Sequence, residues 1–154
     1  SSRAFVKGLG WGTSAQVPHN RSFGVSVWLG GNVSVENIVL RFSGVKRPSQ
    51  TSVFIEENQI SIDNGAIGFQ RPGLGMVWNL PSNRHNNGCS FSFLDGHAET
   101  YRWRGARLRE LNAQYSADDS RSQRPNVGTN PLHSQPWDAK DPDYIRLAET
   151  APDL

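Results

Sequence analysis

The sequence predicts an α+β fold whose core is an antiparallel β-sheet with long loops. Several stretches place apolar residues at every second position, which is typical of strands that bury one face. The chain of 154 residues is polar, with 36% hydrophobic residues, 15 glycines and 9 prolines, and this favours a β-rich domain over a helical bundle. We assign residues 1–115 to a β-rich head, and residues 116–154 to a surface arm and a short C-terminal helix of the same domain.

The first half of the chain holds two predicted strands. Residues 1–22 show no periodicity and are expected to form an irregular entry. Residues 23–29 alternate and predict a strand that ends at Gly30-Gly31. Residues 52–56 are β-branched and aromatic, and residues 53–55 are three consecutive apolar residues, so we expect a central strand that is buried on both faces.

Turn-rich residues 58–83 lead into a predicted β-hairpin over residues 84–103, which begins with a polar loop. Phe91 and Phe93 alternate with serines, which is the pattern of a half-buried strand. Asp95-Gly96 predicts a type I′ turn, because that turn needs positive φ at both central residues. A second alternating strand follows the turn.

The last third of the chain combines an irregular arm with two short helices. Residues 106–111 can form a short helix. Residues 116–140 lose all periodicity and predict a surface arm that is held by Leu132 and Trp137. Residues 141–143 (Asp-Pro-Asp) supply a cap, a proline at the first helical position and an acidic first turn. They predict a C-terminal helix that packs through Tyr144, Leu147 and Ala148.

Charge and composition exclude several functional classes. The formal net charge is +2 and the basic residues form no long run, so no nucleic-acid partner is expected; the densest group is Arg102, Arg104, Arg107 and Arg109. No stretch approaches the ~20 apolar residues of a membrane span, and no signal-peptide pattern opens the chain. The single cysteine, Cys89, excludes an internal disulfide and is expected to be a small buried residue. A catalytic thiol would need a base such as His85 or His97 beside it.

Four ordered motifs are similar to a known bacterial family. His85 is followed by nine residues and then by Asp95-Gly96. This spacing is the signature of the prepilin-processing-associated domain of type II secretion pseudopilin-like proteins from Verrucomicrobia and Planctomycetes. The chain also resembles segments of that family at Lys46–Glu57, Ser61–Gly65 and Pro142–Leu147.

This resemblance implies the globular head of a pseudopilin. The hydrophobic N-terminal helix that anchors such proteins in the inner membrane is absent from the sequence, and in the family it would pack on one face of the sheet. The resemblance implies a structural subunit that faces the periplasm or the cell surface. The partners that it implies are other pilin-like subunits and a secreted cargo or extracellular polysaccharide.

Two kinds of metal site fit the sequence. His85, Asp95 and His97 surround the predicted hairpin, and Glu56 joins them if the central strand pairs with it; histidine and carboxylate suit a divalent transition metal. The resemblance to major pseudopilins implies calcium in a C-terminal loop with oxygen ligands. The candidates for that loop are Asp118, Asp119, Asp138, Asp141 and Asp143. The alternative is that Asp95 only makes the turn, His85 bonds a loop carbonyl and His97 is exposed.

A carbohydrate-binding module is an alternative to a structural role. Exposed aromatic faces can stack on sugar rings, and the chain has five tryptophans: Trp11, Trp28, Trp78, Trp103 and Trp137. The candidate ligand-binding residues are Trp78, Trp103 and Asn86. This alternative predicts at least two exposed, coplanar tryptophans, whereas a structural head predicts that they are buried.

A glycoside hydrolase is the second alternative. It needs two carboxylates across a cleft, and the candidates are Glu56, Glu57, Asp63 and Asp95. Glu56 and Glu57 are adjacent on a strand and point to opposite faces, so they cannot form the pair together. This alternative predicts that Glu56, His85 and Asp95 converge in a pocket, whereas a structural head has no catalytic residue.

Overall fold

The structure, a computed structural model, describes residues 22–29, 41–58, 61, 65–116 and 135–153, together with the backbone of short strands at residues 5–7 and 16–18. Several residues that the sequence singled out lie outside the described residues: Trp11, Asp63, Asp118, Asp119 and Leu132.

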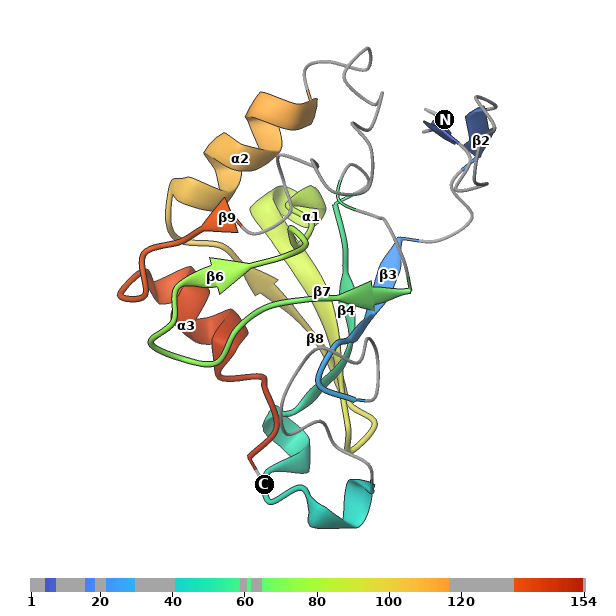
Figure 1. Cartoon of the computed structure of the whole chain (residues 1–154), viewed down its shortest axis with the longest axis vertical. Helices are drawn as coiled ribbons and strands as arrows, with labels where there is room; N and C mark the ends of the chain where they lie inside the picture. Colours follow the sequence, from blue (N-terminus) through green and yellow to red (C-terminus); the bar gives the residue numbers. More distant parts are fainter. Residues whose placement is uncertain are drawn as a thin grey trace.

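A five-stranded β-sheet forms the centre of the fold, in the strand order β5-β3-β4-β7-β8 (Figure 1). Its strands are β3 (Phe23–Ser26), β4 (Ser52–Glu56), β5 (Ala66–Ile67), β7 (Gly88–Phe93) and β8 (Ala98–Arg102). In this sheet β3 and β5 pair in parallel, and the other neighbours are antiparallel. Two short antiparallel ladders join β1 (Phe5–Lys7) to β2 (Gln16–Pro18) and β6 (Met76–Val77) to β9 (Gln135–Pro136). The predicted α+β class is confirmed.

Short helical elements connect and cover the strands. They are the 3-10 turns η1 (Phe42–Gly44) and η2 (Pro48–Gln50), the single turn α1 (Arg84–Asn87), and the helices α2 (Arg107–Ser116) and α3 (Pro142–Ala148). The predicted start of α3 is confirmed, because the Asp141 carboxylate accepts hydrogen bonds from the backbone N–H groups of Asp143 and Tyr144. Helix α2 continues beyond the predicted 106–111.

One face of the sheet forms the hydrophobic core. Ile55 of β4 and the alternating residues Cys89, Phe91 and Phe93 of β7 lie on this face. They cluster with residues from β6, α2, α3 and the segment that follows β9: Val77, Leu108, Leu111, Trp137, Tyr144 and Leu147. The predicted packing face of α3 is confirmed, since its members Tyr144, Leu147 and Ala148 are fully buried.

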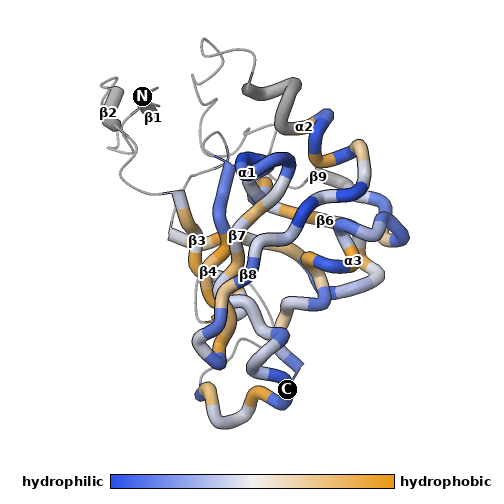
Figure 2. Tube along the Cα trace, turned by 180° about the vertical axis from the view of Figure 1, so that it is seen from behind, coloured by the Kyte–Doolittle hydropathy of each residue, from blue (hydrophilic) through white to orange (hydrophobic). Residues whose placement is uncertain are grey.

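The opposite face of the sheet is partly exposed, and we call it the open face. Strand alternation and register place these side chains on it: Phe23, Val25, Phe54, Glu56, Ser90, Ser92, Ala98, Thr100 and Arg102. Glu56, at one end of this face, is buried. Phe54 is 46% exposed and Phe23 is 44% exposed. The prediction that β4 is buried on both faces is therefore wrong, because the described elements cover its core face and leave Phe54 exposed. Apolar stretches of β3, β4 and β7 are visible from behind the molecule (Figure 2).

Two local predictions are corrected by the backbone. At the hairpin turn only Gly96 has positive φ, at +94°, so Asp95-Gly96 does not form a type I′ turn. Gly96 N donates to Phe93 O and Phe93 N donates to His97 O, which makes a three-residue loop with glycine in the left-handed position. The strand predicted over residues 23–29 ends at Ser26, where a turn begins.

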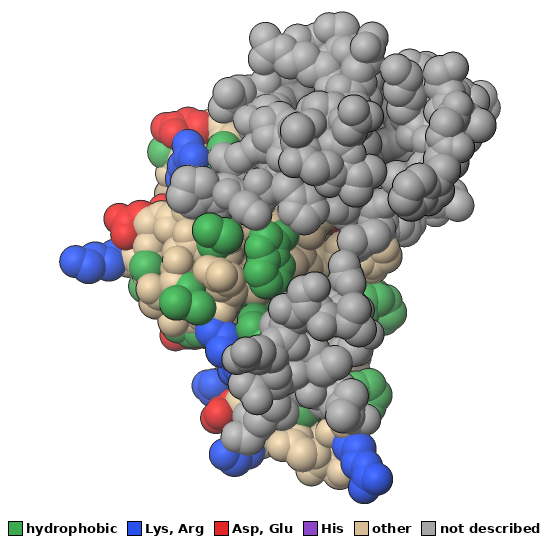
Figure 3. All heavy atoms as spheres, viewed as in Figure 1, with side chains coloured by type: hydrophobic (Ala, Val, Ile, Leu, Met, Phe, Trp, Pro, Cys, Tyr) green, Lys and Arg blue, Asp and Glu red, His purple; other side chains and the backbone are tan. Residues whose placement is uncertain are grey.

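Charged side chains of both signs are distributed over the described surface. On the face drawn in Figure 3, Lys and Arg side chains lie beside Asp and Glu side chains rather than forming one continuous field. Arg102, Arg104 and Arg109 are exposed. Among the described helices, none combines the length and the apolar character that crossing a membrane requires.

Tyr144→Phe is expected to lower the free energy of unfolding by about 1–3 kcal/mol, because it removes a buried hydroxyl that bridges α3 and the loop before β6. This hydroxyl donates to Arg71 O at 2.8 Å and accepts from Gly75 N at 2.8 Å. Equilibrium denaturation with urea measures the loss. An unchanged unfolding midpoint would show that this bridge contributes nothing.

Candidate functional site

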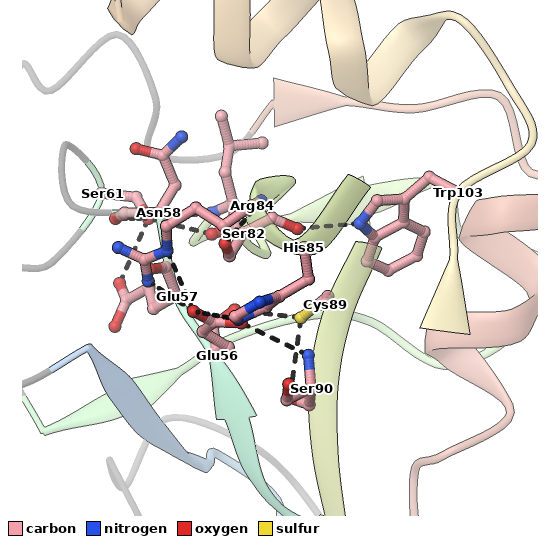
Figure 4. Close-up of polar contacts among 11 residues, drawn as sticks. Glu56, Glu57, Asn58, Ser61, Ser82, Arg84, His85, Cys89, Ser90 and Trp103 are labelled. Carbon is pink, nitrogen blue, oxygen red and sulfur yellow. Dashed lines mark hydrogen bonds and ion pairs between the residues drawn. The ribbon is translucent and has the colours of Figure 1, made fainter. Parts of the chain in front are cut away.

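A buried carboxylate lies at the end of β4, beneath the turn that precedes β7 (Figure 4). The Glu56 side chain is only 5% exposed. It accepts hydrogen bonds from Arg84 Nε at 2.9 Å and from Ser90 N at 3.4 Å. His85 Nε2 lies 3.0 Å from its Oε2 atom. Burying a carboxylate is costly unless it is paired, and two basic side chains pair this one. We call Glu56, Arg84, His85 and Ser90 the Glu56 cluster.

The turn α1 above this carboxylate is left-handed. His85, Asn86 and Asn87 have φ values of 36°, 58° and 62°. Asparagine tolerates this region, whereas a histidine in it is uncommon. Such backbone costs of order 1–3 kcal/mol per residue and persists where surrounding contacts hold it. Here His85 is held by Glu56, and Asn87 Nδ2 donates to Trp103 O at 3.0 Å. The turn is therefore fixed between β4 and the end of β8.

Cys89 is a structural residue of the core. It is fully buried, and its thiol donates to the backbone oxygen of Glu56 at 3.1 Å. Burial raises the pKa of this thiol far above its usual range, and the nearby negative charge of Glu56 raises it further. The expected small buried role is confirmed, and the alternative of a catalytic thiolate is contradicted.

Glu57 belongs to a separate buried network. Ser61 Oγ donates to Glu57 Oε1 at 3.2 Å, and Asn79 Nδ2 donates to the same oxygen at 3.0 Å. Asn79 also accepts a hydrogen bond from Gly68 N at 2.9 Å. Glu56 and Glu57 thus serve different sets of partners, as expected for neighbours on a strand. Both carboxylates connect the end of β4 to the segments that follow it.

Asp95 and His97 form a local pair at the hairpin turn. His97 N donates to Asp95 Oδ1 at 3.2 Å, and His97 Nδ1 lies 2.6 Å from the same oxygen. The His97 ring also stacks on Phe93, with ring centroids 4.4 Å apart. The hydrogen bonds from His97 lower the pKa of the exposed Asp95 carboxyl. These contacts are those of a turn that orders its own side chains.

The predicted cluster of His85, Asp95 and His97 does not form. His85 precedes β7 and Asp95 follows it, so the six-residue strand keeps them about 20 Å apart. A hairpin pairs each residue with the one opposite it on the other strand, and His85 lies at the end of the ladder that is far from the turn with Asp95 and His97. This corrects both the transition-metal ligand set and the hydrolase arrangement of Glu56 with Asp95. No group of three His, Cys, Asp or Glu side chains suited to a metal occurs among the residues with described structure.

The predicted calcium ligands Asp141 and Asp143 bind backbone N–H groups instead. Asp143 is fully buried and accepts hydrogen bonds from Arg104 N at 2.9 Å and Gly105 N at 2.7 Å. Tyr101 OH also donates to Asp143, at 3.2 Å, and burial together with this carboxylate raises the pKa of Tyr101. Asp141 caps α3. Asp138, the third described candidate, accepts a hydrogen bond from Lys140 N.

The described tryptophans do not provide a platform for sugar rings. Trp28, Trp103 and Trp137 are buried, at 5%, 2% and 4% exposure, and Trp78 is half-buried. Trp103 Nε1 donates to Ser82 O at 2.8 Å, which fixes the ring inside the core. The expectation that Trp103 stacks against a ligand is therefore contradicted. Asn86 is exposed on the left-handed turn, and none of the four described tryptophans is exposed.

Sequence reasoning missed Arg84, which binds Glu56 through its guanidinium and donates from Nη2 to Glu57 O at 3.2 Å. The available signal was a glutamate that ends an apolar strand, because such a carboxylate needs a cation when it is buried. Arg84 lies beside His85, at the start of the segment that carries the family spacing, and it was a candidate for this cation.

Comparison with family models, with curated proteins and with solved structures gives no match to this chain.

Proposed function

We propose that this chain is the globular head of a pseudopilin-like structural subunit that faces the periplasm or the cell surface. In this role an apolar helix packs on the open face of the sheet. This helix belongs to the same subunit or to a neighbouring pilin-like subunit. The observation that carries the proposal is the 46% exposure of Phe54 in the middle of a central strand.

The sequence of β4 is that of a strand with apolar residues on both faces, yet the described fold covers one face. Phe54 pairs with Val25 of β3 on one side and with Ser92 of β7 on the other. The open face therefore presents aromatic and aliphatic side chains beside small serine residues. A helix that lies on such a surface can bury the aromatic rings while the small residues allow close approach. Because Phe54 is already about half buried, covering the rest of its side chain contributes about 1 kcal/mol.

The residues of the His-x9-Asp-Gly spacing support a structural role over a hydrolytic one. His85 holds the left-handed turn through Glu56, and Asp95 orders the hairpin turn through His97. The nine intervening residues supply one full strand and its approach to the turn. The spacing thus corresponds to the length of the first strand of a hairpin, and no step of a reaction needs it.

Photo-crosslinking in the intact protein tests this function. A photoreactive phenylalanine analogue is placed at Phe54, and at Phe42 as a matched control, because Phe42 is 63% exposed but lies in η1 outside the open face. After irradiation of the cells that make the protein, we expect position 54 to form a product whose crosslinked peptide maps to an apolar helix of a pilin-like subunit. Position 42 should give no such product.

Crosslinks from position 54 to a soluble enzyme, to glycan or to no partner beyond the control would overturn the proposal. The control is needed because any exposed aromatic position can react with abundant neighbours. Only a difference between the two positions reports on the open face.

A further inference from the structure

Strand β8 is an edge of the five-stranded sheet, so one row of its backbone N–H and C=O groups has no neighbouring strand within that sheet. Trp103 N donates to Asn87 O, which sets the alternation of the β7–β8 ladder. Glu99 and Tyr101 therefore exchange their backbone hydrogen bonds with β7. The backbone N–H and C=O groups that point outward belong to Ala98, Thr100 and Arg102.

These outward groups have no hydrogen-bond partner among the described residues. The side chains of Ala98, Thr100 and Arg102 are also exposed. Proteins often protect such an edge with a proline, a bulge or a covering segment. The β7–β8 register runs without interruption from Gly88–Arg102 to Ser92–Ala98, so β8 is a regular strand along its whole length.

We propose that two copies of this chain associate through their β8 strands, in antiparallel orientation, with Thr100 of one copy opposite Thr100 of the other. In this register Ala98 of each copy lies opposite Arg102 of the other copy. All three outward-pointing residues then form hydrogen-bonded pairs, and each pair exchanges two hydrogen bonds. No other register pairs all three.

Side-chain chemistry favours the same register. On the core side it places Glu99 opposite Tyr101 of the second copy. Arg146 of α3 pairs with Glu99, and its guanidinium lies over the Tyr101 ring, 5.6 Å from the centroid. Each Glu99 thereby meets an aromatic ring and a cation of the other copy. Shifting the register by two residues in one direction would place Glu99 of one copy opposite Glu99 of the other. Like-charge repulsion disfavours that register.

The resulting dimer has a defined consequence for the open face. The two-fold axis of an antiparallel strand pair is perpendicular to the sheet, so the two sheets join into one and both open faces lie on the same side. One strand pair buries less than the ~1,200 Å² of a stable complex, so the dimer is expected to depend on concentration.

Sedimentation velocity of the purified chain, from micromolar to millimolar concentration, tests the association. Thr100→Pro removes the central outward N–H but no hydrogen bond to β7, and proline is tolerated at such edge positions. Thr100→Val is the matched control, because it keeps the N–H and the β-branched shape. We expect the wild type and Thr100→Val to dimerise with rising concentration and Thr100→Pro to stay monomeric.

Disulfide crosslinking gives a second measurement that does not depend on the proline variant being folded. In Thr100→Cys the two cysteines of the dimer have Cα atoms about 5.5 Å apart, within the range of a disulfide. In the control Ser90→Cys, one strand further from the edge, the two cysteines are about 14 Å apart and cannot be bridged. The native Cys89 is buried in both variants.

Mild oxidation is expected to crosslink Thr100→Cys and not Ser90→Cys. A wild type that stays monomeric at millimolar concentration, together with equal crosslinking of the two cysteine variants, would overturn the proposal. A dimer that persists in Thr100→Pro would overturn it too, because another surface would then hold the copies together. Neither result depends on what covers the open face, so association through β8 is tested independently of a helix on that face.

Discussion

Glu56→Ala is expected to lower the free energy of unfolding by about 3 kcal/mol, at the lower end of the loss for breaking a buried ion pair. The carboxylate is 5% exposed and binds Arg84, His85 and the backbone N–H of Ser90. Arg84 and His85 are about half exposed, so each can turn to water after the substitution, and this keeps the loss at the lower end. Equilibrium unfolding in guanidinium chloride measures it.

Asp153→Ala is the matched control for this prediction. Asp153 pairs with Arg47 at 3.4 Å, but both side chains are 49% exposed. A surface pair of this kind contributes about 0–1 kcal/mol. If Glu56→Ala destabilises the chain no more than Asp153→Ala, the Glu56 cluster does not hold the turn before β7.

Gly75→Ala is expected to cost about 3–5 kcal/mol, from a left-handed backbone and a steric clash acting together. Gly75 has a φ of +64°, and a Cβ atom there would lie 2.4 Å from the backbone oxygen of Trp137. A backbone oxygen cannot rotate away as a side chain can. The segments around β6 and β9 would have to separate, and the buried hydroxyl of Tyr144 would lose its contact with Gly75 N.

Gly73→Ala separates the two causes. Gly73 also has positive φ, at +90°, but a Cβ atom there would meet nothing within 4 Å. We expect this control to cost about 1–2 kcal/mol, from the backbone alone. Equal unfolding midpoints for the two variants would contradict the close approach of β6 and the segment around Trp137.

Local rules of sequence predicted the elements that depend on local chemistry. The alternation around Phe91 predicted β7, and Asp141 with the following proline predicted the start of α3. The type of hairpin turn was missed, because Asp-Gly suits both a type I′ turn and a three-residue loop with glycine in the left-handed position. Sequence pattern alone does not choose between them.

Features that depend on distant segments were not predictable in the same way. His85 and Asp95 are close in sequence, but the strand between them holds them apart, so His85 pairs with Glu56 and Asp95 pairs with His97. The pairing of Glu56 with Arg84 joins β4 to a segment far along the chain, and the glutamate at the end of an apolar strand indicates the need for a cation but not which residue supplies it. The exposure of Phe54 was also missed, because an apolar run indicates that both faces are suited to burial and does not say what covers each of them.

Thiol labelling at position 54 tests directly whether an apolar helix covers the open face of the sheet in the intact protein. Phe54→Cys and the control Phe42→Cys are each labelled with a maleimide, in the purified chain and in the intact protein in its cells. The native Cys89 does not interfere, because it is fully buried. We predict that both positions react rapidly in the purified chain, and that position 54 alone is slowed in the intact protein, by on the order of tenfold. Equal rates at the two positions in the intact protein would show that no helix covers the open face.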